Sequence, residues 1–134
     1  MLTQSYQQLT TCSKVASTID LLPSIAKLAG AKIPVDRVVD GKDISPLMFA
    51  EHGAESPHNY FFYYIANELQ AVRSGQWKLR RAKGNTELFN LDHDISETNN
   101  LAKHHPDIAG KLTKVMKVFD SRLMNERRPA GRLE

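Results

Sequence analysis

The sequence predicts an α+β fold: a small four-stranded antiparallel sheet (a meander), backed by a C-terminal amphipathic helix and preceded by an N-terminal helix. Between residues 60 and 91, short apolar segments alternate with turn signals, which is typical of consecutive hairpins. After Pro106, apolar residues recur every three or four positions, which is the period of a helix with one buried face.

The N-terminal helix is expected over residues 15–29. Ser17 or Thr18 can cap its start, and Gly30 suits its end. Pro23 lies early in this stretch, so we expect a kink or a restart there. The helix is expected to face the core with its apolar residues, which are Ile19, Leu22, Ile25, Ala26, Leu28 and Ala29.

The sheet is expected after a long connection that contains a short helix over about residues 46–51. Turns are expected at Asn67-Glu68, at Ser74-Gly75 and at Lys83-Gly84-Asn85. They separate four strands, expected over residues 60–65, 69–73, 77–80 and 87–91. The expected buried set includes Phe62, Tyr64, Val72, Trp77, Leu79 and Leu88.

The C-terminal helix is expected to cover one face of the sheet with a stripe of Ile108, Leu112, Val115, Met116, Phe119 and Leu123. The first strand carries bulky side chains on both faces, more than one helix can cover. Some of Tyr60, Phe61, Tyr63 and Ile65 are therefore expected to be exposed, or covered by residues 1–30 or by another copy of the chain. This pattern predicts a homo-oligomer at high concentration.

Composition limits the classes of partner. The chain has 134 residues, with 41% hydrophobic and 25% charged residues, which fits one globular domain preceded by a flexible arm at residues 1–14. The net charge is +3, but 15 acidic residues are interspersed with the basic ones, so no nucleic-acid partner is expected. No apolar run approaches the roughly 20 residues that span a membrane, so no membrane partner is expected.

The residues of a catalytic or metal site are not evident in the sequence. Cys12 is the single cysteine, and the five histidines lack paired ligand spacing, which favours surface positions for them. Asp92, Asp94 and Glu97 lack the glycine and the terminal glutamate of a calcium loop. We therefore expect no catalytic residue, no metal and no bound cofactor in this chain.

Four segments, in order, resemble segments of sulfatases, most closely those of the arylsulfatase and N-acetylgalactosamine-6-sulfatase type. Residues 15–30 resemble their TIDLLPTL…LAG segment, and residues 40–47 resemble DGxDLSPLL. Residues 61–79 resemble FFYY…AVRxGxWKL, and residues 87–102 resemble ELYDLxxDPxExxNLA, with Ile95 in place of the usual Pro. The resemblance covers roughly residues 15–125 and identifies residues 15–134 as similar to the C-terminal domain of a formylglycine-dependent sulfatase.

The resemblance implies a parent enzyme that hydrolyses sulfate esters. The nucleophile of the family is a formylglycine made from a cysteine in a C-x-P-x-R motif, beside a calcium ion held by Asp and Asn side chains. These groups belong to the N-terminal catalytic domain, the implied partner of this chain. Cys12 is followed by Ser13-Lys14 and is not that cysteine. The chain alone is therefore expected to be inactive, and the resemblance implies an exported parent, whether periplasmic, secreted or lysosomal.

In some members of the family, the C-terminal domain contributes a side chain to the rim of the substrate pocket. The candidates here lie on or just after the third strand and are basic, so they could attract a sulfate ester; they are Lys78, Arg80, Arg81 and Lys83. The alternative for Arg80 and Arg81 is one exposed and one packed strand residue.

Two other functions remain open at the level of sequence. The parent could be a related phosphodiesterase or phosphonate hydrolase. The chain could instead be a stand-alone binding module for anionic glycans or nucleic acid, using the same four basic residues.

Overall fold

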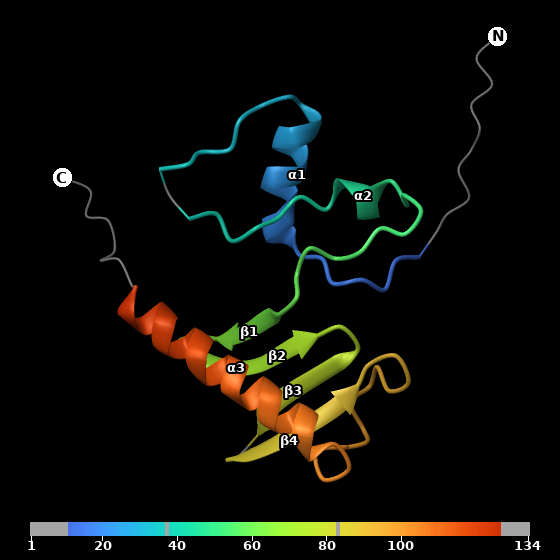
Figure 1. The fold of residues 1–134 in the computed structure, drawn as a ribbon, viewed down its shortest axis with the longest axis vertical. Helices are drawn as coiled ribbons and strands as arrows, with labels where there is room; N and C mark the ends of the chain where they lie inside the picture. The colour runs from blue at the N-terminus through green and yellow to red at the C-terminus, as the bar shows by residue number, and fades with distance from the viewer. Residues whose placement is uncertain (1–10, 37, 83, 127–134) are drawn as a thin grey trace. The chain divides into compact units, whose positions relative to one another are not determined.

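The computed structural model describes residues 11–36, 38–82 and 84–126, and the chain divides into two compact units, residues 1–59 and residues 60–134. Each unit is described by itself (Figure 1). The fold is α+β, as the sequence predicts. None of the helices in the described ranges has the length and the apolar character that a membrane crossing requires.

The second unit holds the predicted meander. Its strands are β1 (Phe61–Ile65), β2 (Glu68–Ser74), β3 (Trp77–Ala82) and β4 (Asn85–Asn90). They pair antiparallel in the order β1-β2-β3-β4, and α3 (Pro106–Asn125) lies across one face of the sheet (Figure 1). Pro at the first helical position and Asp107 in the first turn suit the start of α3, because these positions need no backbone donor and favour negative charge.

The core of this unit lies between the sheet and α3. It consists of Leu69, Val72, Leu79, Leu88, Leu112 and Met116, all at most 4% exposed. Val72, Leu79 and Leu88 are thus buried as predicted, whereas Phe62, Tyr64 and Trp77 are half-buried and pack against the cluster from its edge. The ring of Phe62 stacks on that of Phe119, with centroids 3.7 Å apart.

One member of the predicted helical stripe is not buried. Leu123 is 40% exposed, because it lies one turn beyond Phe119, the last residue of α3 that packs on the core. The aromatic strand is divided as expected between two faces. Tyr60 packs against the core, Phe61 and Tyr63 make an edge-to-face pair with centroids 5.2 Å apart, and Ile65 is 69% exposed.

A β-bulge shifts the register between β1 and β2. Tyr63 pairs with Ala71, but the next residue, Tyr64, pairs with Leu69, so Gln70 is the additional residue. A bulge places two residues opposite one and lets side chains three apart point to the same face. Leu69 and Val72 can therefore both enter the core, although strict alternation would separate them.

The first hairpin turn lies one residue earlier than predicted. Its residues are Ala66 and Asn67, and Glu68 already belongs to β2, paired with Ile65. Ala66 has φ 52°, the left-handed conformation that tight hairpin turns demand. Asparagine tolerates that conformation better than alanine does, which explains why the sequence favours the later position.

The first unit contains a 3-10 turn, η1 (Thr18–Asp20), which continues into α1 (Leu21–Leu28), and a short α2 (Ser45–Met48). Pro23 lies in the first turn of α1, where no backbone donor is needed. The chain changes from 3-10 to α geometry at Leu21, two residues before Pro23, where the kink or restart is predicted, and α1 continues through Pro23.

The prediction that this first helix turns its apolar residues toward a core is wrong for the described chain. Ile19, Leu22, Ile25 and Leu28 are 48%, 61%, 57% and 52% exposed. The buried side is instead made by Asp20, Pro23 and Ser24. The side chains of Asp20 and Ser24 accept hydrogen bonds from the backbone N–H groups of Lys42 and Ile44, which fix that side against the connection that follows.

Candidate functional site

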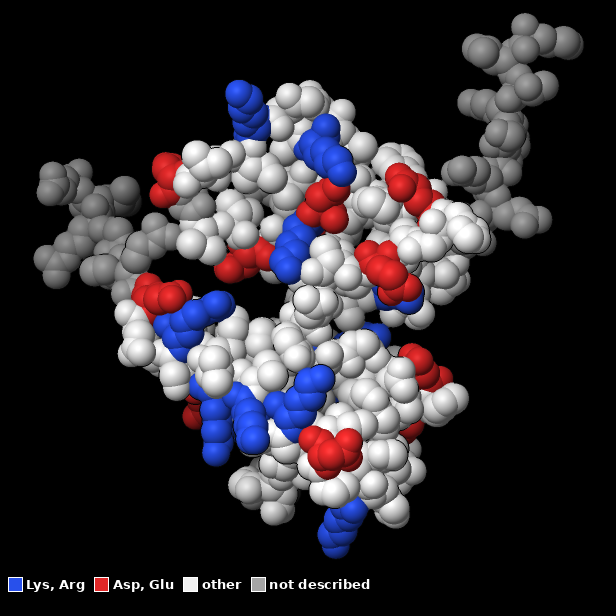
Figure 2. All heavy atoms as spheres, viewed as in Figure 1, with Lys and Arg blue, Asp and Glu red and all other residues white. Residues whose placement is uncertain are grey.

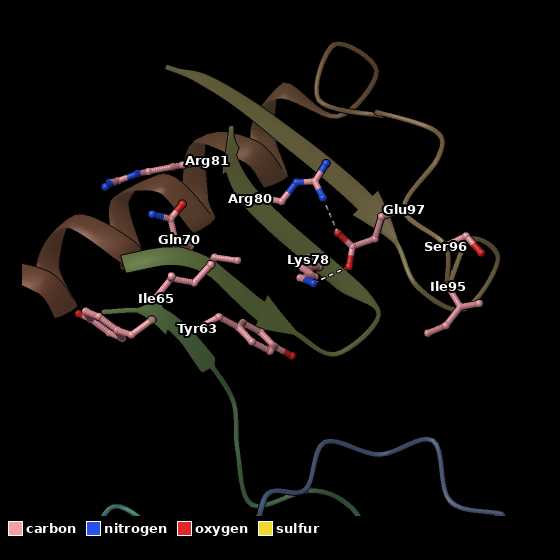
Figure 3. A pocket seen from close by; sticks show the side chains of 11 residues that line it. Tyr63, Ile65, Gln70, Lys78, Arg80, Arg81, Ile95, Ser96 and Glu97 are labelled. Carbon is pink, nitrogen blue, oxygen red and sulfur yellow. Dashed lines mark hydrogen bonds and ion pairs between the residues drawn. The ribbon is translucent and has the colours of Figure 1, made fainter. Parts of the chain in front are cut away.

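An open groove of about 470 Å³ lies on the face of the sheet opposite α3. Its walls come from β1, β2, β3 and the loop after β4 (Figure 3), and the residues labelled there include Tyr63, Gln70, Lys78, Arg80 and Glu97. Side chains of a strand alternate between faces, so Lys78 and Arg80 point into this groove while Leu79 between them enters the core.

Glu97 joins the two cations of the groove. Its carboxylate accepts a short hydrogen bond from Lys78 Nζ and lies 3.3 Å from Arg80 Nη1, and Figure 3 shows both side chains directed toward it. Arg80 also donates to Glu87 on β4, with Nη2 2.6 Å and Nε 2.9 Å from Oε2. Two carboxylates therefore balance the charge of two of the predicted rim residues.

The loop that presents Glu97 is held by Asp94. The carboxylate of Asp94 accepts hydrogen bonds from the backbone N–H groups of Thr98 and Asn99, at 2.9 and 2.8 Å, and the N–H of Asn99 is the main cause of its lowered pKa. Glu97 itself has φ 55°, a conformation that costs a non-glycine residue about 1–3 kcal/mol. The acidic cluster of the sequence is thus used to shape a loop.

Aromatic rings support both cations. Lys78 Nζ lies 4.9 Å from the ring centroid of Tyr63, and the guanidinium carbon of Arg80 lies 5.0 Å from that of Phe89. Such contacts contribute about 0.5–1 kcal/mol each where they are exposed to solvent. Together with the ion pairs, they leave Ala71 and Phe89 beneath them only 3% and 2% exposed.

The other two rim candidates differ from this pair. Arg81 is exposed and extends away from Glu97 in Figure 3, as the alternation of the strand requires. Lys83 lies outside the described residues. Figure 2 shows Lys and Arg gathered over α3 with acidic side chains beside them, so the visible face mixes both signs of charge. The rim role of the four residues stays a prediction.

A buried polar pair lies in the first unit. Nε2 of His58 lies 2.8 and 2.9 Å from the two carboxylate oxygens of Asp20, and their side chains are 6% and 0% exposed. Burial alone would raise the pKa of Asp20, but the backbone N–H of Lys42, the His58 ring and the N–H of Ser17 outweigh it and lower the pKa. The surface position favoured for the histidines is therefore wrong for the His58 side chain.

This pair is not a hydrolytic triad. The nearby hydroxyl, that of Ser24, donates to the backbone oxygen of Asp20 at 2.7 Å and accepts from the N–H of Ile44 at 2.9 Å. A nucleophile must instead donate to the base and lie open to substrate. Nothing in the sequence singles out the pair, because Asp20 and His58 are separated by 38 residues.

The metal and the nucleophile of a formylglycine enzyme do not fit the residues described here. Within residues 11–36, 38–82 and 84–126, no group of three or more His, Cys, Asp or Glu side chains could hold a metal ion. Cys12 is exposed and lacks the C-x-P-x-R context. No catalytic step can be assigned to these residues.

Comparison with known proteins places the chain among sulfatases. It is 30% identical to a sulfatase of Formosa agariphila over 135 residues, covering 85% of this chain and 24% of that protein. It is 44% identical to the steryl-sulfatase of Mus musculus over 66 residues, covering 46% of this chain and 10% of that protein. No family model matches.

A solved structure supports the same relationship. Ps i-CgsB, crystallised in complex with k-i-k-neocarrahexaose, is 28% identical with a TM-score of 0.66, and the match covers 81% of this chain and 25% of that one. The chain thus spans about a quarter, or less, of the length of these relatives.

A four-stranded antiparallel meander backed by one helix defines the second unit as a small α+β domain. The order of its sequence segments, the matched sulfatases and the partial coverage of each relative specify it further. The chain corresponds to the C-terminal domain of a sulfatase.

Proposed function

We propose that this chain is the C-terminal part of an enzyme that hydrolyses sulfate esters, and that it packs against the catalytic domain and completes it. The similarity to sulfatases over 85% of the chain carries the proposal. The named relatives include an arylsulfatase, steryl-sulfatases and an N-acetylgalactosamine-6-sulfatase, which favours a sulfatase over a phosphodiesterase or a glycan-binding module.

The rest of the polypeptide, in this proposal, supplies the chemistry. The formylglycine and the calcium ion that the family implies would belong to the catalytic domain, since the residues described here do not fit either group. The role of this chain, in the proposal, is to provide a preformed surface at the edge of the catalytic domain. The proposal also includes an exported parent.

Arg81 is the rim candidate that its surroundings favour. Lys78 and Arg80 are each paired with carboxylates, so their charge is partly neutralised before any substrate arrives. Arg81 is exposed and carries a full positive charge at neutral pH. A side chain of this kind could attract an anionic ester toward the pocket.

The test uses the polypeptide that the complete reading frame encodes. With 4-nitrophenyl sulfate as probe, the full polypeptide is expected to release nitrophenol. A version that lacks residues 1–134, and a version that ends at Asn59 and so lacks only the second unit, are both expected to lose that activity. The Arg81→Ala variant is expected to raise KM while kcat changes little, and Arg122→Ala, another exposed arginine, serves as the control. Hydrolysis of 4-nitrophenyl phosphate in place of the sulfate would contradict the proposal.

A further inference from the structure

Helix α1 has its apolar and polar sides reversed relative to a helix that packs on its own domain. With 3.6 residues per turn, Leu21, Leu22, Ile25 and Leu28 fall within one arc of about 120° around the axis of α1. They are 43%, 61%, 57% and 52% exposed. Pro23 and Ser24 fall outside this arc and are buried, as is Asp20 just before the helix. The chain therefore turns a polar side inward and leaves leucine and isoleucine in water.

Hydrogen bonds, not apolar packing, fix this orientation. Ser24 Oγ accepts from the N–H of Ile44 at 2.9 Å, and Asp20 accepts from the N–H of Lys42 at 2.8 Å. Gly41, next to Lys42, approaches η1 so closely that a Cβ there would lie 1.9 Å from the backbone oxygen of Ile19. Rotating α1 to bury its leucines would break all of these contacts, so the exposed side is a fixed surface.

The first unit also has little apolar core of its own. Of the buried hydrophobic residues in the described chain, only Val15 and Ile44 lie before residue 60, and the other eight lie in the second unit. The first unit nevertheless carries nine exposed large hydrophobics, against five in the second. A unit with this balance is incomplete, because burial of apolar surface is the main stabilising contribution to folding.

The relatives indicate what covers the surface. Residues 60–134 are 75 of the 134 residues, or little more than half, so an alignment that covers 85% of the chain must include much of the first unit. That alignment covers only 24% of the Formosa agariphila protein. The first unit therefore recurs inside a polypeptide about four times longer, most of which is available to cover α1.

We propose that the side of α1 formed by Leu21, Leu22, Ile25 and Leu28 is buried against the catalytic domain of the same sulfatase polypeptide, as part of its hydrophobic core. The inference rests on the proposed function, whose catalytic domain it names as the occupant. In this arrangement the second unit folds on its own core, and α1 anchors the chain to the larger domain.

The test compares one double variant, Leu22→Gln with Ile25→Gln, in two settings. In the 134-residue chain, the melting temperature is expected to change by less than about 2 °C, since exposed positions tolerate polar residues. In the polypeptide encoded by the complete reading frame, it is expected to fall by about 10 °C or more, or the protein is expected to become insoluble. Val118→Gln, at a position on α3 that is 70% exposed, is the control and should be neutral in both settings.

A conservative variant and hydrogen exchange separate burial from general misfolding. Leu22→Met with Ile25→Leu should restore the full polypeptide to within a few degrees of the parent. Amides of α1 should exchange more slowly in the full polypeptide than in the 134-residue chain.

Three results would overturn the inference. The full polypeptide could tolerate the double glutamine variant, the 134-residue chain could be destabilised by it, or the 134-residue chain could form a dimer that the variant dissociates. Destabilisation of the 134-residue chain would show that its own residues bury the apolar side of α1. A dimer that the variant dissociates would show that a second copy buries it. The melting temperature needs no enzymatic activity, so a full polypeptide that fails to hydrolyse sulfate esters yet loses stability would refute the proposed function alone.

Discussion

The imidazole of His58 lies against the carboxylate of Asp20, with Nε2 2.8 Å from Oδ1, and both side chains are almost completely buried. This contact ties the end of the long connection to the start of α1. It determines which side of α1 points inward, and with it the position of the exposed apolar side.

Acid is expected to weaken the first unit through Asp20. The pKa of Asp20 is lowered in the folded chain, so its contribution to stability is fully present above the ordinary value of 3.8 and is lost as the pH falls through the lower folded value. Hydrogen exchange or thermal melting of wild type and Asp20→Asn between pH 7 and pH 3 measures this. The difference between the two proteins should be largest at neutral pH, about 3 kcal/mol or more, and should narrow in acid. Asp40→Asn, which removes one carboxylate at an exposed position, is the matched control variant.

Two glycine substitutions are expected to have opposite effects. Gly41→Ala should destabilise the first unit, because the new Cβ would meet the backbone oxygen of Ile19 at 1.9 Å. Gly110→Ala should stabilise α3 by about 0.5–1 kcal/mol, because its Cβ meets nothing within 4 Å and alanine favours helix. Denaturant titrations of both variants provide the comparison, and equal effects would contradict the close approach at Gly41.

The packing of the core predicts that Leu79→Ala and Trp77→Ala lower the free energy of unfolding by different amounts. Leu79→Ala should lower the free energy of unfolding of the second unit by about 3 kcal/mol, since Leu79 is 1% exposed at the centre of the cluster. Trp77→Ala should cost less than the roughly 3–5 kcal/mol of a fully buried tryptophan, because Trp77 packs at the edge beside His105. Urea unfolding monitored by circular dichroism tests the order, and a reversed order would place Trp77 at the centre.

Self-association is expected at high protein concentration. Strand β1 lies at the edge of the sheet, and Ile65 on it is 69% exposed, so β1 offers both backbone groups and an apolar side chain to a second copy. Sedimentation near millimolar concentration should show a dimer, and Ile65→Lys should return the chain to a monomer. A wild-type monomer at that concentration would refute this expectation.

The isolated chain is expected to be inactive. No turnover of 4-nitrophenyl sulfate should be seen with or without added calcium, because the described residues include no metal-binding cluster and Cys12 lacks the required motif. Turnover that a single substitution in this chain abolishes would show that the chemistry resides here.

Local patterns were sufficient to predict the sheet and α3. Alternation around Leu79 and helical spacing around Leu112 and Met116 each predict which residues are buried. The surfaces that bury them, the sheet and α3, both lie within residues 60–134. The same reasoning fails for α1. A helical pattern shows that Leu22 and Ile25 favour burial, but it does not show whether the surface that buries them belongs to the same unit.

The groove was only half predictable. The basic residues of the third strand are visible in the sequence, whereas their carboxylate partner Glu97 comes from a loop 17 and 19 residues away from Arg80 and Lys78. The position of that loop depends on the capping interactions of Asp94, which spacing alone cannot distinguish from an acidic metal-binding cluster.

The bulge at Gln70 makes this residue the one position of β2 that strand pairing does not require. Without Gln70, Tyr63 would still face Ala71 and Tyr64 would still face Leu69, and Leu69 would lie two residues before Val72, on the same core face. A deletion between Ala71 and Ser74, where β2 pairs with both neighbouring strands, would instead turn side chains to the opposite face. In related chains, a one-residue gap aligned with β2 is therefore expected at Gln70 and would mark a regular strand that buries the same leucine.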